Sequence, residues 1–338
     1  MNQRLITPME PILTNTIADW EGWIHQIKWD GIRGLCYLEG SVLRIFTKNG
    51  HEQSEYYPEL SCLRQLTTAK QAVFDGEIIA LNEQDKPSFE HILRRERVSS
   101  PKKINYYANL YPVKYIVFDI VSLNGRLLTA EPLQSRLEKL RNILNPNAAV
   151  AITDNFSDGK KLFELMQKIG WEGIVSKNSA SLYSPGKHHH DWFKTKLMKR
   201  MLTTVGGIQY KNSFANALLL GIYRKNELHF IGKASLGLKQ TDFQLLNHFA
   251  ELSKAPFSPF QRTTGLSNIK WLKPVLTCWV EFFEWTPNGQ LRHPKIAGFS
   301  SEPAENANGK EQTPAWNPSP LTVNLSELLT PKNSSGQN

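Results

Sequence analysis

Alternating and continuous apolar runs in the first half of the chain predict a sheet-rich domain. Residues 35–48 predict two short strands around a Glu-Gly turn, because apolar and polar positions alternate along them. The longer apolar runs Ala72–Leu81 and Lys114–Val121 predict two further strands, and WIHQI at residues 23–27 is strand-like as well. Both longer runs contain acidic residues within an otherwise apolar strand.

Apolar residues at helical spacing also occur in the first half of the chain. Leucines three and four positions apart predict a helix over Glu131–Leu144, and a second predicted helix, Lys160–Ile169, ends at Gly170. Residues 88–111 begin with a helical pattern, SFEHILRR, and continue as a loop. We expect the leucine-bearing helix to pack on a sheet, because its apolar stripe is too short for a coiled coil.

The pattern changes after Arg200, where short strands separated by turn residues begin and only one helix, Thr241–Leu252, is predicted. Several short strands within about 100 residues are typical of a small barrel such as an OB-fold. From about residue 302, frequent Asn, Pro, Ser and Gly predict a flexible tail with a short apolar anchor over Leu321–Leu329. We therefore expect the chain to consist of a first domain of residues 1–200, a second domain of residues 201–302 and a tail of residues 303–338.

The amino-acid composition shows that the chain is basic and has few cysteines. The 338 residues carry a formal net charge of +9, which favours a polyanionic partner, with nucleic acid ahead of a membrane. Cys36, Cys62 and Cys278 lie far apart, which excludes a four-thiolate zinc site within the chain and argues against a disulfide framework. No segment reaches roughly 18 apolar residues, so we expect a cytoplasmic protein that does not enter a membrane.

The segment KWDGIR, residues 28–33, is the first candidate for chemistry. Lys28 follows a strand-like run, and a lysine becomes a nucleophile when partial burial and nearby cations lower its pKa. Asp30-Gly31 predicts a sharp turn that returns Arg33 to the side of the lysine, where a guanidinium could bind a phosphate or a ribose hydroxyl. The alternative is a surface Lys and Arg that merely flank a turn.

Four later segments provide further candidate residues for a catalytic site. Carboxylates interrupt an apolar strand in FDGEIIAL, an aromatic residue and an aspartate end another in YIVFD, and WEGIVSK places Glu172 beside a strand. In WFKTK, period-two alternation places Lys194 and Lys196 on one strand face. Each segment alone is more often structural. Together they provide a nucleophilic lysine, two carboxylates for a divalent ion, an aromatic platform and cations for phosphates, as nucleotidyl transfer requires.

The ordered set KWDGIR, FTKNG, FDGEIIAL, YIVFDIVSLNG, WEGIVSK and WFKTK resembles the nucleotidyltransferase superfamily of ATP-dependent DNA ligases and mRNA capping enzymes. The chain looks most like the ligase domain of bacterial end-joining ligases, and FIGKASLGL and EWTPNGQLRHPKIAGF resemble segments of that family's OB domain. The resemblance covers residues 5–300. It implies an α+β adenylation domain with antiparallel sheets and flanking helices, followed by an OB-fold β-barrel domain that moves about a hinge near Lys196–Leu202.

The resemblance also implies residue roles. Lys28 would attack the α-phosphate of ATP and form lysyl-AMP, while Phe118 would stack on adenine and Gln26 and the Ile27 backbone would contact its edge. The expected metal ion is Mg²⁺, with Mn²⁺ as the alternative, held by Glu77 and Glu172; Glu77 is also placed at the ribose. The expected phosphate and sugar contacts are Arg33, Lys194 and Lys196. The expected DNA contacts are Arg33, Lys48, Lys187, Lys233 and Arg292.

Three positions depart from the family pattern. Family members usually have Glu at position 26 and Arg at position 48, whereas this chain has Gln26 and Lys48. Lysine keeps the charge but loses the bidentate fork of arginine. Ser300 stands where an arginine that orients the leaving pyrophosphate is expected, which leaves Arg292, Lys295 or Lys310 as replacements or predicts slow self-adenylylation.

The partner predicted for such an enzyme is nicked or broken duplex DNA in repair or recombination, with a DNA-end-binding repair protein as a further partner and a monomeric chain. A GTP-using capping enzyme or an RNA ligase is the close alternative, and a non-catalytic nucleic-acid-binding relic is the alternative from another class. An NAD-dependent ligase is disfavoured. His188, His189 and His190 are expected in a polar loop, because three consecutive side chains converge poorly on one metal ion.

Overall fold

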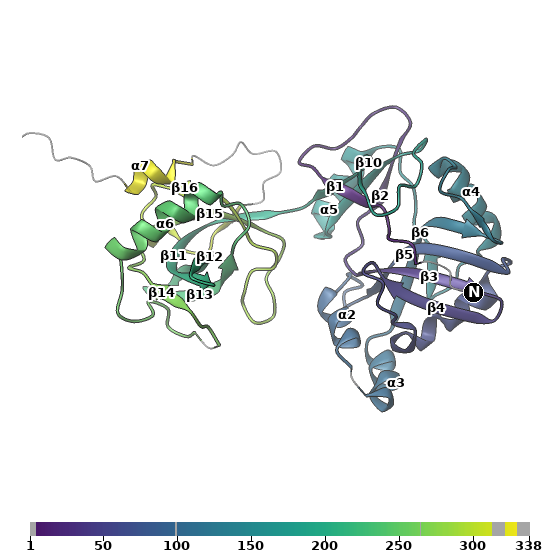
Figure 1. Ribbon diagram of the computed structural model, residues 1–338, viewed down its shortest axis with the longest axis horizontal. Coiled ribbons are helices and arrows are strands. Elements are labelled where there is room, and N and C mark those ends of the chain that lie inside the picture. The colour runs from purple at the N-terminus through teal and green to yellow at the C-terminus, as the bar shows by residue number, and fades with distance from the viewer. Residues whose placement is uncertain (1–4, 99, 264, 313–321, 330–338) are drawn as a thin grey trace, which may run out of the picture. The chain divides into compact units, whose positions relative to one another are not determined.

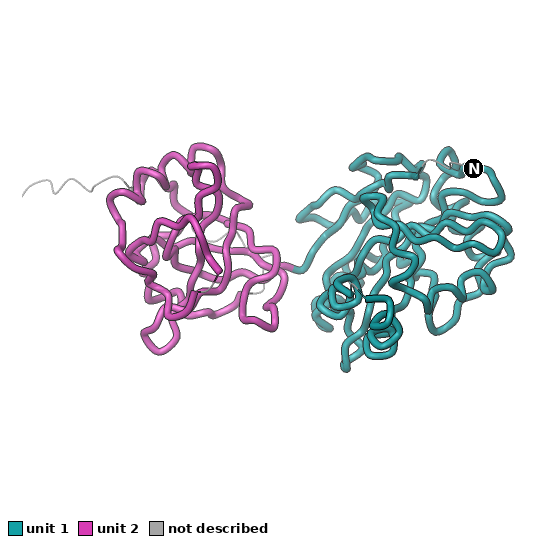
Figure 2. The backbone as a smooth tube through the Cα atoms, turned by 60° about the horizontal axis from the view of Figure 1, so that its bottom comes forward, with its two compact units in different colours: residues 1–197 teal, residues 198–338 magenta. Residues whose placement is uncertain are grey.

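The computed structural model describes residues 5–98, 100–263, 265–312 and 322–329. Its internal contacts divide the chain into two compact units, Met1–Leu197 and Met198–Asn338, shown in two colours in Figure 2. Each unit has its own apolar core. No helix of the described residues is long and apolar enough to cross a membrane.

The first unit contains two sheets (Figure 1). The smaller has the order β1 (Glu10–Leu13), β10 (His188–Lys196), β9 (Gly173–Asn178), β2 (Trp23–Ile27). The larger has the order β4 (Val42–Thr47), β3 (Ile32–Glu39), β5 (Gln71–Ala80), β6 (Val113–Leu123), β7 (Arg126–Leu127), with β8 (Val150–Ile152) parallel to β6. Most neighbours are antiparallel; β1 with β10 and β6 with β8 are the parallel pairs of these two sheets. The predicted strands over residues 23–27, 35–48, 72–81 and 114–121 are confirmed.

Helices cover the sheets of this unit. They are α1 (Leu63–Leu66), α2 (Phe89–Glu96), α3 (Pro101–Leu110), α4 (Leu133–Ile143) and α5 (Gly159–Ile169). Two 3-10 turns, Ser54–Tyr56 and Pro58–Cys62, precede α1. As predicted, α4 packs its leucines on the larger sheet beside β6, and α5 ends at Gly170, whose φ of 68° provides the left-handed cap.

Two sequence-based expectations for this unit are wrong. The loop expected after residue 96 contains α3, which begins with Pro101 in its first turn, where proline favours a helix. The loop expected at residues 188–190 is the first part of β10. There the backbone of β1 provides a parallel partner, pairing Glu10 with His188, and the sequence alone does not show that pairing.

The second unit is built around one long, bent strand. The central path of its sheet is β13 (Glu227–Ala234), β12 (Phe214–Arg224), β11 (Lys199–Lys211), β15 (Thr277–Phe282), β16 (Lys295–Ser300), and β14 (Ile269–Trp271) and β17 (Glu311–Gln312) also pair with β11. The predicted helix is present as α6 (Gln240–Leu252), and α7 (Leu325–Leu329) contacts it (Figure 1). The three cysteines of the chain are free thiols.

The stretch from residue 303 is more ordered than its composition predicts. The 3-10 turn Ala304–Asn306 lies on the unit, Ala307 is fully buried, and β17 pairs with the start of β11. The predicted apolar anchor corresponds to α7, whose Leu325 is buried in the core of the unit, while residue 321 lies outside the described residues. A few small apolar side chains and backbone hydrogen bonds are enough to fix these short segments, although the surrounding sequence is polar.

Candidate functional site

One face of the smaller sheet collects the predicted catalytic lysine and the paired lysines. Lys194 and Lys196 alternate along β10, and Lys28 follows β2, where its backbone N–H donates to the carbonyl of Gly173 at 2.9 Å. The same face of β10 carries Trp192, because side chains two residues apart point to the same side of a strand. The predicted grouping of these lysines is therefore present in the structure.

Glu172 joins two of the lysines. Its Oε2 accepts a hydrogen bond from Lys28 Nζ, and its Oε1 lies 2.7 Å from Lys196 Nζ. The carboxylate is only 5% exposed, whereas the side chains of Lys28 and Lys196 are 20% and 22% exposed. Burial alone would raise the pKa of Glu172, but Lys28 and Lys196 outweigh burial and hold that pKa below its usual value. Glu172 is therefore charged at neutral pH.

Burial and crowding of positive charge lower the pKa of Lys194. Burial is the largest cause, and Lys28 and Lys196 add to it, while the carboxylate of Glu10 opposes it. Three lysines gathered on one face attract polyanionic ligands, since such a ligand relieves repulsion among the cations.

Arg33 is held more tightly than the sequence suggests. Its Nε and one terminal nitrogen donate to the two carboxylate oxygens of Asp75, both at 2.6 Å, and that nitrogen also donates to the carbonyl of Met9 at 3.0 Å. Asp75 is fully buried and accepts a further hydrogen bond from the hydroxyl of Tyr183 at 2.6 Å. Arg33 thus forms a buried bidentate ion pair at the floor of the site.

Glu77 lies two residues after Asp75 on β5, directly across from Arg33 on β3. Burial raises the pKa of Glu77 to about 7; Lys28 and Arg33 lower it, and Glu172 opposes them. Glu77 thus interacts electrostatically with Glu172, the other predicted metal-binding carboxylate.

Phe118 on β6 lies among cations. The guanidinium of Arg33 is 4.6 Å from the centre of its ring, and the ammonium nitrogen of Lys177 is 4.4 Å from it. Lys177 Nζ also lies 4.1 Å from the ring of Trp192, the residue paired with it across β9 and β10. Cation–π attraction of this kind fixes the position of a ring. Phe118 is half-buried, so part of the ring is accessible.

Lys177 is the most unusual group that sequence reasoning missed. Its side chain is 2% exposed, and within the described residues its Nζ has no hydrogen-bond partner. Burial lowers the pKa of Lys177 to about 7, with the carboxylate of Asp119 opposing and Arg33 adding to the decrease. Asp119 itself forms a fully buried bidentate pair with Arg136. Alternation within EGIVSK could have indicated that Lys177 points inward, but not that it lacks a partner.

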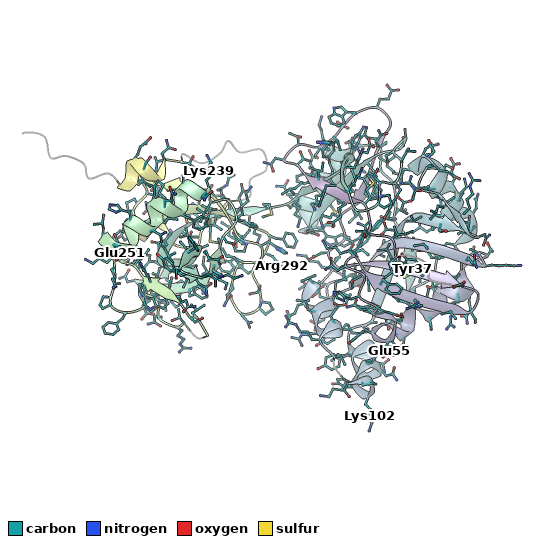
Figure 3. The ribbon with its side chains drawn as sticks, viewed as in Figure 1. Tyr37, Glu55, Lys102, Lys239, Glu251 and Arg292 are labelled. Atoms are coloured by element: carbon teal, nitrogen blue, oxygen red, sulfur yellow. The ribbon has the colours of Figure 1, made fainter. Side chains whose placement is uncertain are left out.

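The predicted DNA contacts are dispersed. Lys48 lies 3.4 Å from Glu10 and contributes to the positive potential at Lys194. Lys187 is exposed at the start of β10. In the second unit, exposed Lys233 donates to Gln209 at 2.9 Å, and Arg292, labelled in Figure 3, is only 13% exposed and pairs with Glu284 at 2.8 Å.

Ser300 occupies a buried position at the end of β16. It is 4% exposed, its carbonyl accepts from Thr277, and its hydroxyl accepts from the backbone N–H of Glu302. An inward-facing serine cannot take the place of the expected arginine. Lys295 and Lys310 are exposed and available to bind an anion.

A divalent cation fits this site only in an open arrangement. The described residues contain no group of three or more His, Cys, Asp or Glu side chains suited to enclose an ion. Mg²⁺ usually takes one or two carboxylates and completes its shell with water and substrate phosphates. Glu77 and Glu172 match that requirement, because they are two carboxylates that interact electrostatically.

Solved structures resemble this fold. Mycobacterial DNA ligase D complexed with ATP and MES is 26% identical, with a TM-score of 0.51, over 89% of this chain and 97% of that chain. A Lig E DNA ligase is 17% identical with a TM-score of 0.60 and covers 88% of this chain and 100% of that chain, a likeness of fold alone. Fold and site together define the class as a two-domain nucleotidyltransferase. The predicted α+β adenylation domain followed by an OB-fold domain is thereby confirmed.

Comparison of the sequence with models of protein families identifies the family of this chain. The model described as "ATP dependent DNA ligase domain" matches residues 7–196, and "ATP dependent DNA ligase C terminal region" matches residues 211–302. The chain belongs to the ATP-dependent DNA ligase family. The predicted enzyme class, an ATP-dependent DNA ligase, is confirmed. It is favoured over a GTP-using capping enzyme or RNA ligase and over a non-catalytic nucleic-acid-binding relic.

Among curated relatives is the multifunctional non-homologous end joining DNA repair protein LigD of Mycobacterium tuberculosis, 28% identical over 284 residues, 82% of this chain and 36% of the relative. The corresponding protein of Pseudomonas aeruginosa is 26% identical over 303 residues, 85% of this chain and 35% of the relative. The chain thus spans about a third of the length of these relatives.

Proposed function

We propose that this chain seals nicks between a 5′-phosphate and a 3′-hydroxyl in duplex DNA through an AMP adduct on Lys28. The hydrogen-bonded group of Lys28, Glu172 and Lys196 is the observation that carries the proposal, because it places a partly exposed amine beside a buried carboxylate and a second cation. Glu172 accepts a hydrogen bond from Lys28 Nζ and so holds the amine in place for attack on a nucleotide phosphate.

The amine then forms a bond to the α-phosphorus of ATP as the bond to pyrophosphate breaks. Lys194 and Lys196 neutralise the charge that develops on the phosphate oxygens. In the second step the AMP passes to the 5′-phosphate of DNA and Lys28 is regenerated. In the third step the neighbouring 3′-hydroxyl attacks that phosphate and AMP leaves.

Other groups in the site position the nucleotide. Phe118 provides a stacking platform for adenine, and Gln26 and the Ile27 backbone face its edge. Arg33, clamped by Asp75, uses its other terminal nitrogen for the sugar or for the 5′-phosphate of DNA. Mg²⁺, or Mn²⁺ in its place, is held by Glu77 and Glu172 and acts as a Lewis acid on the phosphates when bound.

DNA is the proposed partner of both units, with residues 1–200 as the adenylation domain, 201–302 as the OB-fold domain and a hinge near Lys196–Leu202. Lys48, Lys187, Lys233 and Arg292 contact the phosphate backbone, so sealing weakens steeply with salt. Since the relatives' names refer to non-homologous end joining, we also propose a role in joining broken ends, together with a DNA-end-binding repair protein and with this chain as a monomer.

Labelling with ATP tests the proposal. The chain should gain one adenylyl group in intact mass after incubation with ATP and Mg²⁺, and Lys28→Ala should abolish both the adduct and nick sealing while duplex DNA still binds. Lys161→Ala is the matched control, because that lysine is 84% exposed on α5. Equal sealing by Lys28→Ala and the parent, or labelling by GTP alone, would overturn the assignment.

A further inference from the structure

Two side-chain amides are linked next to the lysine-bearing site. The Nε2 of Gln26 donates to the Oδ1 of Asn155 at 2.7 Å, and Gln26 is only 2% exposed. Asn155 belongs to a segment that runs alongside the free edge of β2. The backbones of His25 and Phe156 exchange two hydrogen bonds of 2.9 and 2.8 Å, so the neighbouring residue Asn155 is fixed against that strand.

Gln26 is close to where a nucleotide would lie. It shares a strand face with Lys28, since the two are two residues apart, which corresponds to roughly 6.6 Å along a strand. Across the sheet Gln26 pairs with Val175, which is two residues from Lys177, the residue in contact with Phe118. The side chain of Gln26 thus shares a sheet face with Lys28 and with Lys177.

The link to Asn155 leaves one atom of Gln26 uncommitted. An amide has a donor end and an acceptor end, and here the donor end is occupied by Asn155. Within the described residues, the carbonyl Oε1 of Gln26 accepts no hydrogen bond. The lysines on the same face favour this orientation, because their positive potential attracts the carbonyl oxygen and repels the amide nitrogen. The open end of Gln26 is therefore a hydrogen-bond acceptor.

We propose that Asn155 is a specificity-determining residue that orients Gln26 so that the site accepts adenine and rejects guanine. The proposal rests on the proposed function. Position 6 of adenine carries an amino donor, whereas position 6 of guanine carries a carbonyl acceptor. An acceptor on Gln26 satisfies the first and leaves the second facing an oxygen.

A glutamine at position 26 needs a partner that holds its side-chain amide in one orientation. A carboxylate presents an acceptor in either orientation, but an amide rotated by half a turn would present a donor and would favour guanine. In the structure Asn155 presents its Oδ1 to Gln26, and the positive potential of the neighbouring lysines favours that choice over the rotated pair. Gln26 and Asn155 together therefore do what a single glutamate would do alone.

The experiment compares the affinities of the full-length protein for the α,β-methylene analogues of ATP and GTP by calorimetry. These analogues cannot transfer the nucleotidyl group, so binding is measured without chemistry. Asn155→Leu should reduce the preference for the adenine analogue by about tenfold or more, the usual effect of freeing a buried polar group from its partner. Asn155→Asp, which can only accept from Gln26 Nε2, should keep the preference. Asn142→Leu, at an exposed position on α4, is the matched control.

Gln26→Glu provides the second arm. In that background Asn155→Leu should no longer change the preference, because a carboxylate needs no orienting partner. An unchanged preference in Asn155→Leu, a shift towards GTP in Asn155→Asp, or a parent protein without base preference would each overturn the inference. If the parent prefers the adenine analogue yet ATP fails to label Lys28, the proposed catalytic function fails while the specificity role stands.

Discussion

Replacing Lys177 by methionine should stabilise the first unit and remove a pH dependence of its unfolding. Lys177 is 2% exposed, and no atom of the described chain accepts a hydrogen bond from its Nζ. Methionine fills a similar volume without a charge. The prediction depends on how much free energy the protein loses by burying this amine.

The pKa values give the magnitude. The pKa of Lys177 falls from 10.5 to about 7 on folding, mainly because burial disfavours the ammonium. Between those values the unfolded chain holds a proton that the folded chain lacks, so stability rises with pH by about 1.4 kcal/mol per pH unit. At pH 7.5 the accumulated cost is on the order of 4 kcal/mol, and below pH 7 it is complete, on the order of 5 kcal/mol. Imperfect packing of the new side chain should reduce the measured gain to about 2–3 kcal/mol at pH 7.5.

Urea unfolding of the full-length protein at steps from pH 6.5 to 9.5 measures this effect. The free energy of unfolding of the first unit should rise with pH in the parent, and the advantage of Lys177→Met should shrink as pH increases. Lys161→Met, at a position 84% exposed, should follow the parent. Parallel curves for the parent and Lys177→Met, or a variant less stable at every pH, would refute the reasoning.

Three further outcomes are expected. Glu172→Gln should slow adenylylation at least a hundredfold while circular dichroism stays unchanged, because removing one charged group from a preorganised site typically costs roughly 10²–10³ in rate; unaltered labelling would contradict this. Arg33→Lys should lower the free energy of unfolding by about 2–4 kcal/mol, since Asp75 keeps its burial but loses a bidentate partner, and thermal unfolding at pH 7.5 measures it. Gly173→Ala should disturb the pairing of β9 with β10 and reduce labelling, because its φ is 138° and an added Cβ would lie 2.1 Å from the carbonyl oxygen of Thr195; wild-type stability and labelling would argue against that strain.

The sequence predicted the parts of the site that depend on local pattern. Alternation along a strand placed Lys194 and Lys196 on one face, and a carboxylate beside a strand marked Glu172, which the structure joins to Lys28. These predictions succeed because strand periodicity is a local property. The position of Lys28 next to Glu172, 144 residues away, followed only from the ordered set of motifs.

The remainder depends on pairings between distant segments, which no local pattern shows. The carboxylates within the apolar strand indicated that Asp75 needs a partner, but not that it would bind two nitrogens of Arg33. Lys177 is buried because Phe118 and Trp192 converge on it from two different sheets. The histidines of β10 are part of a strand because a parallel neighbour, β1, lies nearly two hundred positions earlier in the chain.

The pairing of β17 with β11 joins a late segment of the second unit to its first strand. Glu311 lies 2.8 Å from Lys199 and accepts from the indole nitrogen of Trp285 at 2.5 Å, while Gln312 pairs with Arg200. The first strand of the second unit is thus fastened by a segment that lies far later in the sequence. Shortening the protein near residue 303 would remove β17 and expose a bare edge of β11, so a change made late in the sequence would be felt in the strand with which the second unit begins.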